Sequence, residues 1–239
     1  LKLYKMKKII LSLSLALITI SAFSQSRQSG YTKMYDRTID INQRSLAFGL
    51  TEAQFEAIKD DAYANPNFLP GKIFQDDELL KDNVPMRYNA YADEIEIKQA
   101  ATDESYGALI KSPDIFVKIA TDIYVFIPFE GSIEKGGYFN VLVEGENYNL
   151  YKKTKAEFKE PKVAETSYQR DTPPSFPTTV TYFLVKDGKF LQIPNRKSRI
   201  MKMMDSKKSE MKQFVKQHDI DLDDEKDLIK TIKYFDSLL

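Results

Sequence analysis

Residues 70–194 constrain the fold more than any other part of the chain, because apolar side chains recur there at every second position. Val84, Met86 and Tyr88 alternate with polar neighbours, and comparable runs return about every ten residues between clusters of Gly, Asn and Asp. Alternate side chains of a β-strand point to opposite faces of the sheet. The pattern therefore predicts about eight to ten mostly antiparallel strands, arranged as a roll, a barrel or a sandwich.

Turn residues place three hairpins within this region. They join residues 84–90 to 94–98, residues 138–143 to 148–153, and residues 181–186 to 189–193. The third is the clearest, since Asp187-Gly188 accepts the positive φ angles of a two-residue type I′ turn. In the first, apolar and polar residues alternate, which predicts one solvent-facing side. The unbroken apolar run over residues 123–127 predicts the most buried strand of the sheet.

Helical periodicity is found on both sides of the strand region. Thr51-Glu52-Ala53-Gln54 has the form of a capping box, which predicts a helix over about residues 52–62 that ends before Asn65-Pro66. After Pro194, apolar residues at helical spacing predict amphipathic helices that pack on the sheet or on each other. Their apolar stripes are Ile200, Met203 and Met204; Met211, Phe214 and Val215; and Leu228, Ile229, Ile232, Phe235 and Leu239.

The expected fold class is α+β, a mostly antiparallel β roll, barrel or sandwich with a helical C-terminal segment. Four segments follow: a signal peptide over residues 1–24, an N-terminal arm with one short helix over residues 25–69, a β-rich domain over residues 70–195, and C-terminal helices packed on that domain over residues 196–239. Within the β-rich domain, residues 160–177 contain four prolines and predict a long surface loop without a regular hydrogen-bonding edge.

The first 24 residues have the features of a secretory signal peptide. Four lysines precede an apolar stretch over residues 9–23, and Ala22-Phe23-Ser24 has the small-x-small form of a cleavage site. A membrane span needs about twenty apolar residues, so cleavage is the better interpretation than a permanent anchor. We therefore expect an exported protein, periplasmic or associated with the envelope or the extracellular medium, with no transmembrane segment after cleavage.

The charge balance of the exported chain argues against nucleic acid as a partner. The full sequence has 35 basic and 35 acidic residues, and removal of residues 1–24 takes away four lysines and no acid, leaving a formal charge of −4. Proteins that bind nucleic acid carry a basic surface that neutralises phosphates. The short basic run Lys152-Lys153-Thr154-Lys155 is too small to reverse this expectation.

The side-chain inventory excludes most familiar catalytic chemistries. The chain has no cysteine and one histidine, His218, which falls at the predicted end of a helix, where it can bond terminal carbonyls. This inventory therefore excludes zinc sites built from Cys and His. Residues 219–223 read Asp-Ile-Asp-Leu-Asp, like the opening of a calcium loop, but Asp224 and Lys230 occupy the positions that call for Gly and Glu. We expect no metal site and no cofactor.

Two groups of residues remain as candidates for function. Tyrosines near strand ends can build an aromatic platform for a ligand or a partner, although filling of the core is the alternative reading: Tyr88, Tyr91, Tyr138, Tyr148 and Tyr151. Acidic residues near turns can pair as the two carboxylates of a glycosidase-like hydrolase, although solvated strand ends explain them equally: Asp93, Glu94, Glu96, Glu144 and Glu146.

Four features between about residues 70 and 239 occur together: Pro70-Gly71-Lys72-Ile73, Arg87-Tyr88-Asn89 leading to Asp93-Glu94-Ile95-Glu96, Val143-Glu144-Gly145 and the lysine-rich tail with Tyr234-Phe235. In these features the chain resembles an uncharacterised family of exported proteins common in Bacteroidetes-type bacteria. These segments contain no catalytic signature. The resemblance implies a Gram-negative envelope or extracellular setting and transfers no active residue.

The sequence favours binding over catalysis. The first hypothesis is a non-enzymatic envelope protein that binds an unknown partner or ligand through its β-sheet surface. A carboxylate-dependent hydrolase of the envelope is the second, and it requires two acidic side chains facing each other across a cleft. The third is an assembly component that docks on another chain through its C-terminal helices, which an uncovered apolar helix stripe would favour.

Overall fold

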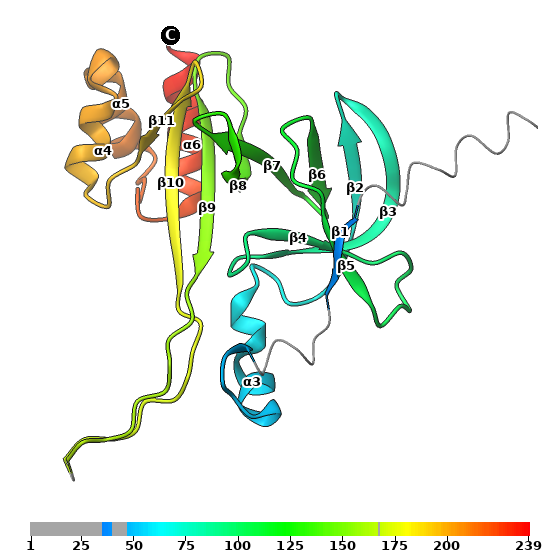
Figure 1. The fold of residues 1–239 in the computed structure, drawn as a ribbon. Coiled ribbons are helices and arrows are strands. Elements are labelled where there is room, and N and C mark those ends of the chain that lie inside the picture. Colours follow the sequence, from blue (N-terminus) through cyan, green and yellow to red (C-terminus); the bar gives the residue numbers. More distant parts are fainter. Residues whose placement is uncertain (1–34, 40–46, 167) are drawn as a thin grey trace, which may run out of the picture.

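The computed structural model describes residues 35–39, 47–166 and 168–239, and it contains eleven strands and six helical segments (Figure 1). The strands are β1 (Tyr35–Ile39), β2 (Leu69–Gln75), β3 (Glu78–Asn89), β4 (Glu94–Ile97), β5 (Tyr106–Leu109), β6 (Ile115–Ile119), β7 (Asp122–Phe129), β8 (Ser132–Val143), β9 (Asn149–Ala156), β10 (Thr178–Lys186) and β11 (Lys189–Gln192). The helices are α3 (Glu52–Ile58) with the 3-10 turn η2 (Lys59–Ala62), α4 (Lys197–Met203), the 3-10 turn η3 (Asp205–Lys207), α5 (Lys208–Gln217) and α6 (Glu225–Ser237).

All strands belong to one antiparallel sheet in the order β1-β5-β4-β3-β2-β6-β7-β8-β9-β10-β11. The α+β class with a mostly antiparallel sheet is thus confirmed. In the described chain β1 and β11 are the two ends of this order, so the sheet is open and is not a closed barrel. The predicted signal peptide and most of the predicted arm before Ala47 lie outside the described residues. Within the described ranges, no helix combines the length and apolar character needed to cross a bilayer.

The three predicted hairpins are present as β3–β4, β8–β9 and β10–β11. In the last, Lys186 pairs with Lys189, and Asp187 and Gly188 have φ angles of 49° and 71°. Both angles are positive, as a type I′ turn requires. The local turn chemistry therefore sets the register of this sheet edge.

The capping box of α3 is also confirmed. The backbone N–H of Gln54 donates to Thr51 Oγ1 at 3.3 Å, and the N–H of Thr51 donates to Gln54 Oε1 at 3.0 Å. These bonds satisfy amide groups that have no partner inside the helix. Phe55 and Ala62 are buried, and the Ala62 carbonyl accepts the backbone N–H of Ala90 at 2.9 Å, which attaches η2 to the end of β3.

Two apolar clusters occupy the same face of the sheet. The first lies under β2–β8 and includes Ile73, Met86, Ile95, Phe126 and Tyr138. The second lies between β8–β11 and the C-terminal helices, and contains Leu150, Leu184, Met211, Ile232 and Phe235. On β9, Leu150 of the second cluster and Ala156 of the first are six residues apart, so strand periodicity places them on one face. The predicted stripes of the C-terminal helices are therefore largely covered by the sheet.

The last turn of α6 is fastened to the β8–β9 turn by one carboxylate. Asp236 accepts backbone N–H bonds from Glu146, Asn147 and Tyr148 at 2.8, 2.9 and 2.8 Å. Burial would raise the pKa of Asp236, but these three bonds outweigh that effect and hold the pKa below its ordinary value. Any side chain at Gly145 would collide with the Asp236 carboxylate, which explains the glycine at this turn.

Residues 157–166 and 168–177 form the two limbs of an extended arm between the end of β9 and the start of β10 (Figure 1). Isolated bridges, Lys159 to Ser175 and Lys162 to Thr172, join the limbs. The four prolines prevent a continuous ladder, as predicted. At its base the arm is rooted in the core by Phe176, which is 3% exposed, whereas Tyr168 near its tip is 98% exposed.

Two burial predictions were wrong. The run over residues 123–127 alternates between buried and half-buried side chains, because β7 has the core on one face only. Strand β4 is instead buried on both faces, and Glu94 and Glu96 lie inside. The segment between η2 and β2 closes over the face that was expected to meet solvent, since Tyr63, Pro66 and Phe68 contact Arg87 there.

Candidate functional site

Four aromatic rings lie together on the face of the sheet opposite the C-terminal helices. They are Phe139 on β8, Tyr151 on β9, Phe183 on β10 and Phe190 on β11, and we call them the outer aromatic cluster. The ring centroids of Phe139 and Phe190 are 5.2 Å apart, those of Phe139 and Phe183 5.7 Å, and those of Tyr151 and Phe190 5.8 Å. Leu150 and Leu184, one position away, point to the helices, so Tyr151 and Phe183 must face outward.

A hollow of about 600 Å³ lies beside the outer aromatic cluster, and we call it the aromatic groove. Phe129, Phe139, Phe183 and Phe190 line its apolar part, and Asp93 and Lys153 line it as an ion pair. Phe129 is 57% exposed, and the three other phenylalanines are half-buried. Sites for small molecules have volumes of roughly 300–1,000 Å³, mostly apolar walls and a few placed polar groups.

The ion pair in the groove is part of a partly buried polar network. Lys153 Nζ lies 2.6 Å from Asp93 Oδ1 and donates to the Tyr138 carbonyl at 2.8 Å. The Tyr88 hydroxyl donates to the same Asp93 oxygen at 2.7 Å. Burial lowers the pKa of Lys153, and the neighbouring Asp93 opposes this shift. The network gives the groove a fixed polar end.

Gly137 makes room for this ion pair. A Cβ atom at this position would lie 2.5 Å from Asp93 Oδ2 and 2.6 Å from Lys153 Nζ. Contacts that short are not tolerated, so a side chain at position 137 would displace the Asp93 carboxylate or the Lys153 ammonium group. The ion pair thus explains why glycine occupies position 137, whereas the sequence Gly136-Gly137 by itself indicates only a turn.

The structure does not bring the five predicted tyrosines together. Tyr88 and Tyr138 are 3% and 2% exposed in the first apolar cluster, with ring centroids 6.5 Å apart. Burial raises the pKa of both phenols. Tyr91 packs against Phe48 and Phe176, and Tyr148 packs against Phe235 of α6. Tyr151 is the one of the five that belongs to the outer aromatic cluster.

The predicted carboxylates are dispersed as well. Glu96 is fully buried and accepts bonds from Arg87 and Asn89, and Glu94 is buried on the same strand. Asp93 is bound to Lys153 and Tyr88. Glu144 and Glu146 are exposed at the β8–β9 turn. Of the five, Asp93 is the one that lines the aromatic groove.

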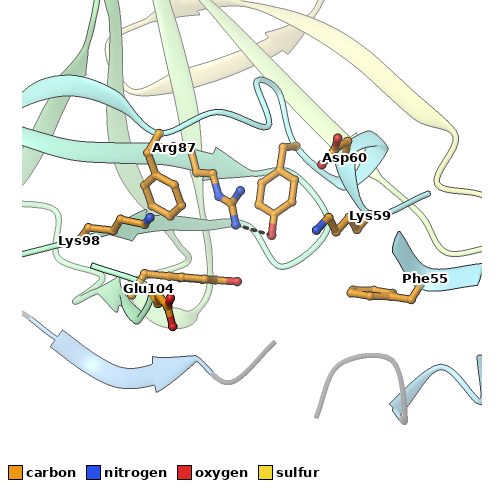
Figure 2. A pocket seen from close by; sticks show the side chains of 9 residues that line it. Phe55, Lys59, Asp60, Arg87, Lys98 and Glu104 are labelled. Carbon is orange, nitrogen blue, oxygen red and sulfur yellow. Dashed lines mark hydrogen bonds between the residues drawn. The ribbon is translucent and has the colours of Figure 1, made fainter. Parts of the chain in front are cut away.

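A second hollow, of about 240 Å³, lies in front of Arg87, and we call it the Arg87 pocket (Figure 2). Arg87 is held between aromatic rings, with its Cζ 3.8 Å from the Tyr63 centroid, 4.3 Å from that of Phe68 and 5.1 Å from that of Tyr106. Its guanidinium group also binds Glu96 at 2.8 Å and donates to the Pro66 carbonyl at 2.6 Å. The lining residues of the pocket come from α3, η2, the segment before β2, β3, the segment between β4 and β5, and β5.

His218 lies at the end of α5, as predicted. Its backbone N–H donates to the Phe214 carbonyl, and the two rings are 4.6 Å apart. Of the carboxylates that resemble a calcium loop, Asp221 and Asp223 pair with Lys197 at 2.7 and 3.7 Å. No three His, Cys, Asp or Glu side chains gather as metal ligands in the part of the chain that the structure describes.

Sequence reasoning missed the phenylalanines of the groove. Phe139, Phe183 and Phe190 fall in predicted strands, but the predicted aromatic platform contains tyrosines alone. A usable signal was present, because residues 138–143 and 181–185 are apolar at almost every position. Strands with one covered face alternate instead, so this excess of apolar side chains indicates a second apolar face.

Comparisons with protein-family models, with curated proteins and with solved structures find no match for this chain. The fold and the site themselves define the class: an α+β protein with an open antiparallel sheet and an aromatic groove on one face.

Proposed function

We propose that this is an exported, non-enzymatic envelope protein that binds a small apolar molecule in the aromatic groove of its β-sheet. The pattern of residues 1–24 supports export, and the resemblance of residues 70–239 supports a Gram-negative envelope. The observation that carries the binding role is the hollow of about 600 Å³ beside three clustered phenylalanine rings. A groove of this kind removes the apolar surface of a ligand from water, which favours binding.

The polar end of the groove orients such a ligand. Asp93 and Lys153 satisfy each other, so the groove does not depend on a charged ligand for neutrality. A mainly apolar molecule with one hydrogen-bonding group fits this arrangement best. Its ring or chain lies on Phe139, Phe183 and Phe190, and its polar group faces the ion pair.

The test is a titration with 1-anilinonaphthalene-8-sulfonate, whose fluorescence rises in apolar sites. We expect saturable binding to the native protein. Phe183→Ala and Phe190→Ala remove groove walls and weaken binding about tenfold each, because each loses more than one kcal/mol of apolar contact. Phe74→Ala is the matched control, since Phe74 is half-buried on β2, stacks on Phe116 and does not line the groove.

A backbone amide NMR titration of the unmodified protein separates loss of binding from loss of folding. Ligand addition should shift the resonances of Gly136, Gly137 and Gly188, which line the groove. Unshifted glycine resonances at saturation, or equal weakening by Phe74→Ala, contradict the proposal. A large shift confined to the exposed arm would instead indicate that the binding surface lies there.

A further inference from the structure

The Arg87 pocket has the properties of a second binding site, independent of the aromatic groove. The two hollows share no lining residue. The aromatic groove lies over β7–β11, whereas the Arg87 pocket lies among β3–β5, η2 and the segment before β2. The question is which ligand the second pocket fits.

Cationic side chains face the centre of the Arg87 pocket. In Figure 2 the nitrogen ends of Lys59, Arg87 and Lys98 point inward from three sides, while the carboxylates of Asp60 and Glu104 point away from the centre. Lys59 shares an exposed ion pair with Glu56. Lys98 lies 4.7 Å from the Phe68 centroid, and no carboxylate of the described residues is within ion-pair distance of it. The inward-facing charge favours an anion.

Arg87 supplies a fixed floor for this site. Glu96, Pro66 and Tyr63 hold its guanidinium in place, and the Arg87 side chain is 12% exposed. A guanidinium that is already positioned loses little conformational entropy when it binds an anionic oxygen. Lys98 supplies a positive charge that has no carboxylate at ion-pair distance among the described residues.

Aromatic rings form the remaining walls. Phe55, Tyr63, Phe68 and Tyr106 line the pocket. Ring faces favour a flat, polarisable body, because aromatic pairs are stabilised by stacked or edge-to-face contact. The volume of about 240 Å³ accommodates a single six-membered ring with its substituent.

We propose that the Arg87 pocket binds a small aromatic carboxylate. The carboxylate group lies between Lys98 and the outward edge of Arg87, and the ring of the ligand packs against the aromatic walls. An aliphatic acid retains the charge contact but loses the ring contact. A phosphate ion retains the charge contact and has no ring.

The experiment is an NMR titration of the full chain with sodium benzoate, with cyclohexanecarboxylate and with inorganic phosphate. Benzoate should bind saturably and shift amides of residues 59–68 and 96–106, and the other two anions should bind at least about tenfold more weakly. Lys98→Gln should weaken benzoate binding about tenfold, the effect of one lost charge-assisted contact. Lys98 lies outside both apolar clusters, so this variant is expected to fold.

Two control variants make the outcome specific. Lys72→Gln removes a lysine that pairs with Asp82 outside the pocket, and it should leave benzoate affinity unchanged. Phe183→Ala should also leave it unchanged, which separates this site from the aromatic groove. Absence of saturable binding, equal affinity for phosphate, or undiminished affinity in Lys98→Gln would each overturn the proposal.

Discussion

Two largely buried charged side chains, Arg87 and Glu96, explain why neither face of the β3–β4 hairpin is exposed to solvent. Arg87 and Glu96 are paired partners on the two strands, and Glu96 also accepts a bond from Asn89 at 2.7 Å. Opposite charges directly across an antiparallel pair attract each other, and here the segment before β2 encloses them. Arg87 thus both stabilises the hairpin and forms the floor of the Arg87 pocket.

Glu96→Ala is expected to destabilise the protein by about 3–5 kcal/mol, because it leaves the Arg87 charge in a buried position without its main partner. Urea unfolding followed by circular dichroism measures the change. Asp82→Ala removes an exposed partner of Lys72 and should hardly move the unfolding midpoint. Similar midpoints for the two variants would show that the Arg87–Glu96 pair is not structurally important.

Gly137→Ala is expected to destabilise the protein by about 1–3 kcal/mol, because the new Cβ overlaps the Asp93–Lys153 pair. The control is the same change in a Lys153→Ala background, where the contact with Lys153 Nζ is removed and only the contact with Asp93 Oδ2 remains. There the substitution should be clearly less harmful, which a double-mutant cycle detects as a coupling free energy. Additive effects would show that the overlap is relieved elsewhere.

The secondary-structure elements were predicted well where local chemistry decides them. The β10–β11 turn at Asp187-Gly188 and the capping box of α3 depend on neighbouring residues alone, so the sequence contains the information. Burial of each strand face depends on distant segments. Nothing near residues 94–97 indicates that the segment before β2 closes over β4. Residues 123–127 likewise do not reveal that one face of β7 stays partly open.

The contact of α6 with the β8–β9 turn predicts a pH dependence of stability. The pKa of Asp236 is below its ordinary value of 3.8 in the folded protein. Its stabilising contribution is therefore fully present above pH 3.8 and is lost as the pH falls through the lowered pKa. Asp236→Ala should lower the unfolding midpoint by a constant amount between roughly pH 7 and about pH 5, and the difference from the native protein should shrink below that range.

Asp205→Asn is the matched control for Asp236, because Asp205 pairs only with an exposed lysine, Lys208, among the contacts of the described residues. Its unfolding midpoint should follow that of the native protein at every pH. A difference for Asp236→Ala that grows towards low pH would have the opposite sign to the one expected.

At the scale of the whole molecule, the two faces of the sheet carry different groups of side chains. One face carries both apolar clusters and the C-terminal helices, and the other carries the outer aromatic cluster. The α+β class followed from periodicity alone. The groove did not, because it is assembled from β7, β8, β9, β10, β11 and the β3–β4 turn, and their pairing order is a property of the complete sheet.

Export of the protein is expected to remove residues 1–24. When the full sequence is produced in a Gram-negative cell, mass spectrometry of the envelope and periplasmic fractions should find a chain that begins at Gln25. A lysine-free variant of the first eight residues should be processed more slowly. Recovery of the unprocessed chain in the cytosol would contradict the proposed localisation.

The most direct test of the proposed binding role is a crystal structure of the protein soaked with a brominated apolar compound such as 4-bromophenol. The anomalous signal of bromine locates the compound without any assumption about affinity. We predict a peak between Phe139, Phe183 and Phe190, with the hydroxyl group of the compound towards the Asp93–Lys153 pair. A groove without a bromine peak, in a crystal where the compound is bound elsewhere on the protein, would contradict the account.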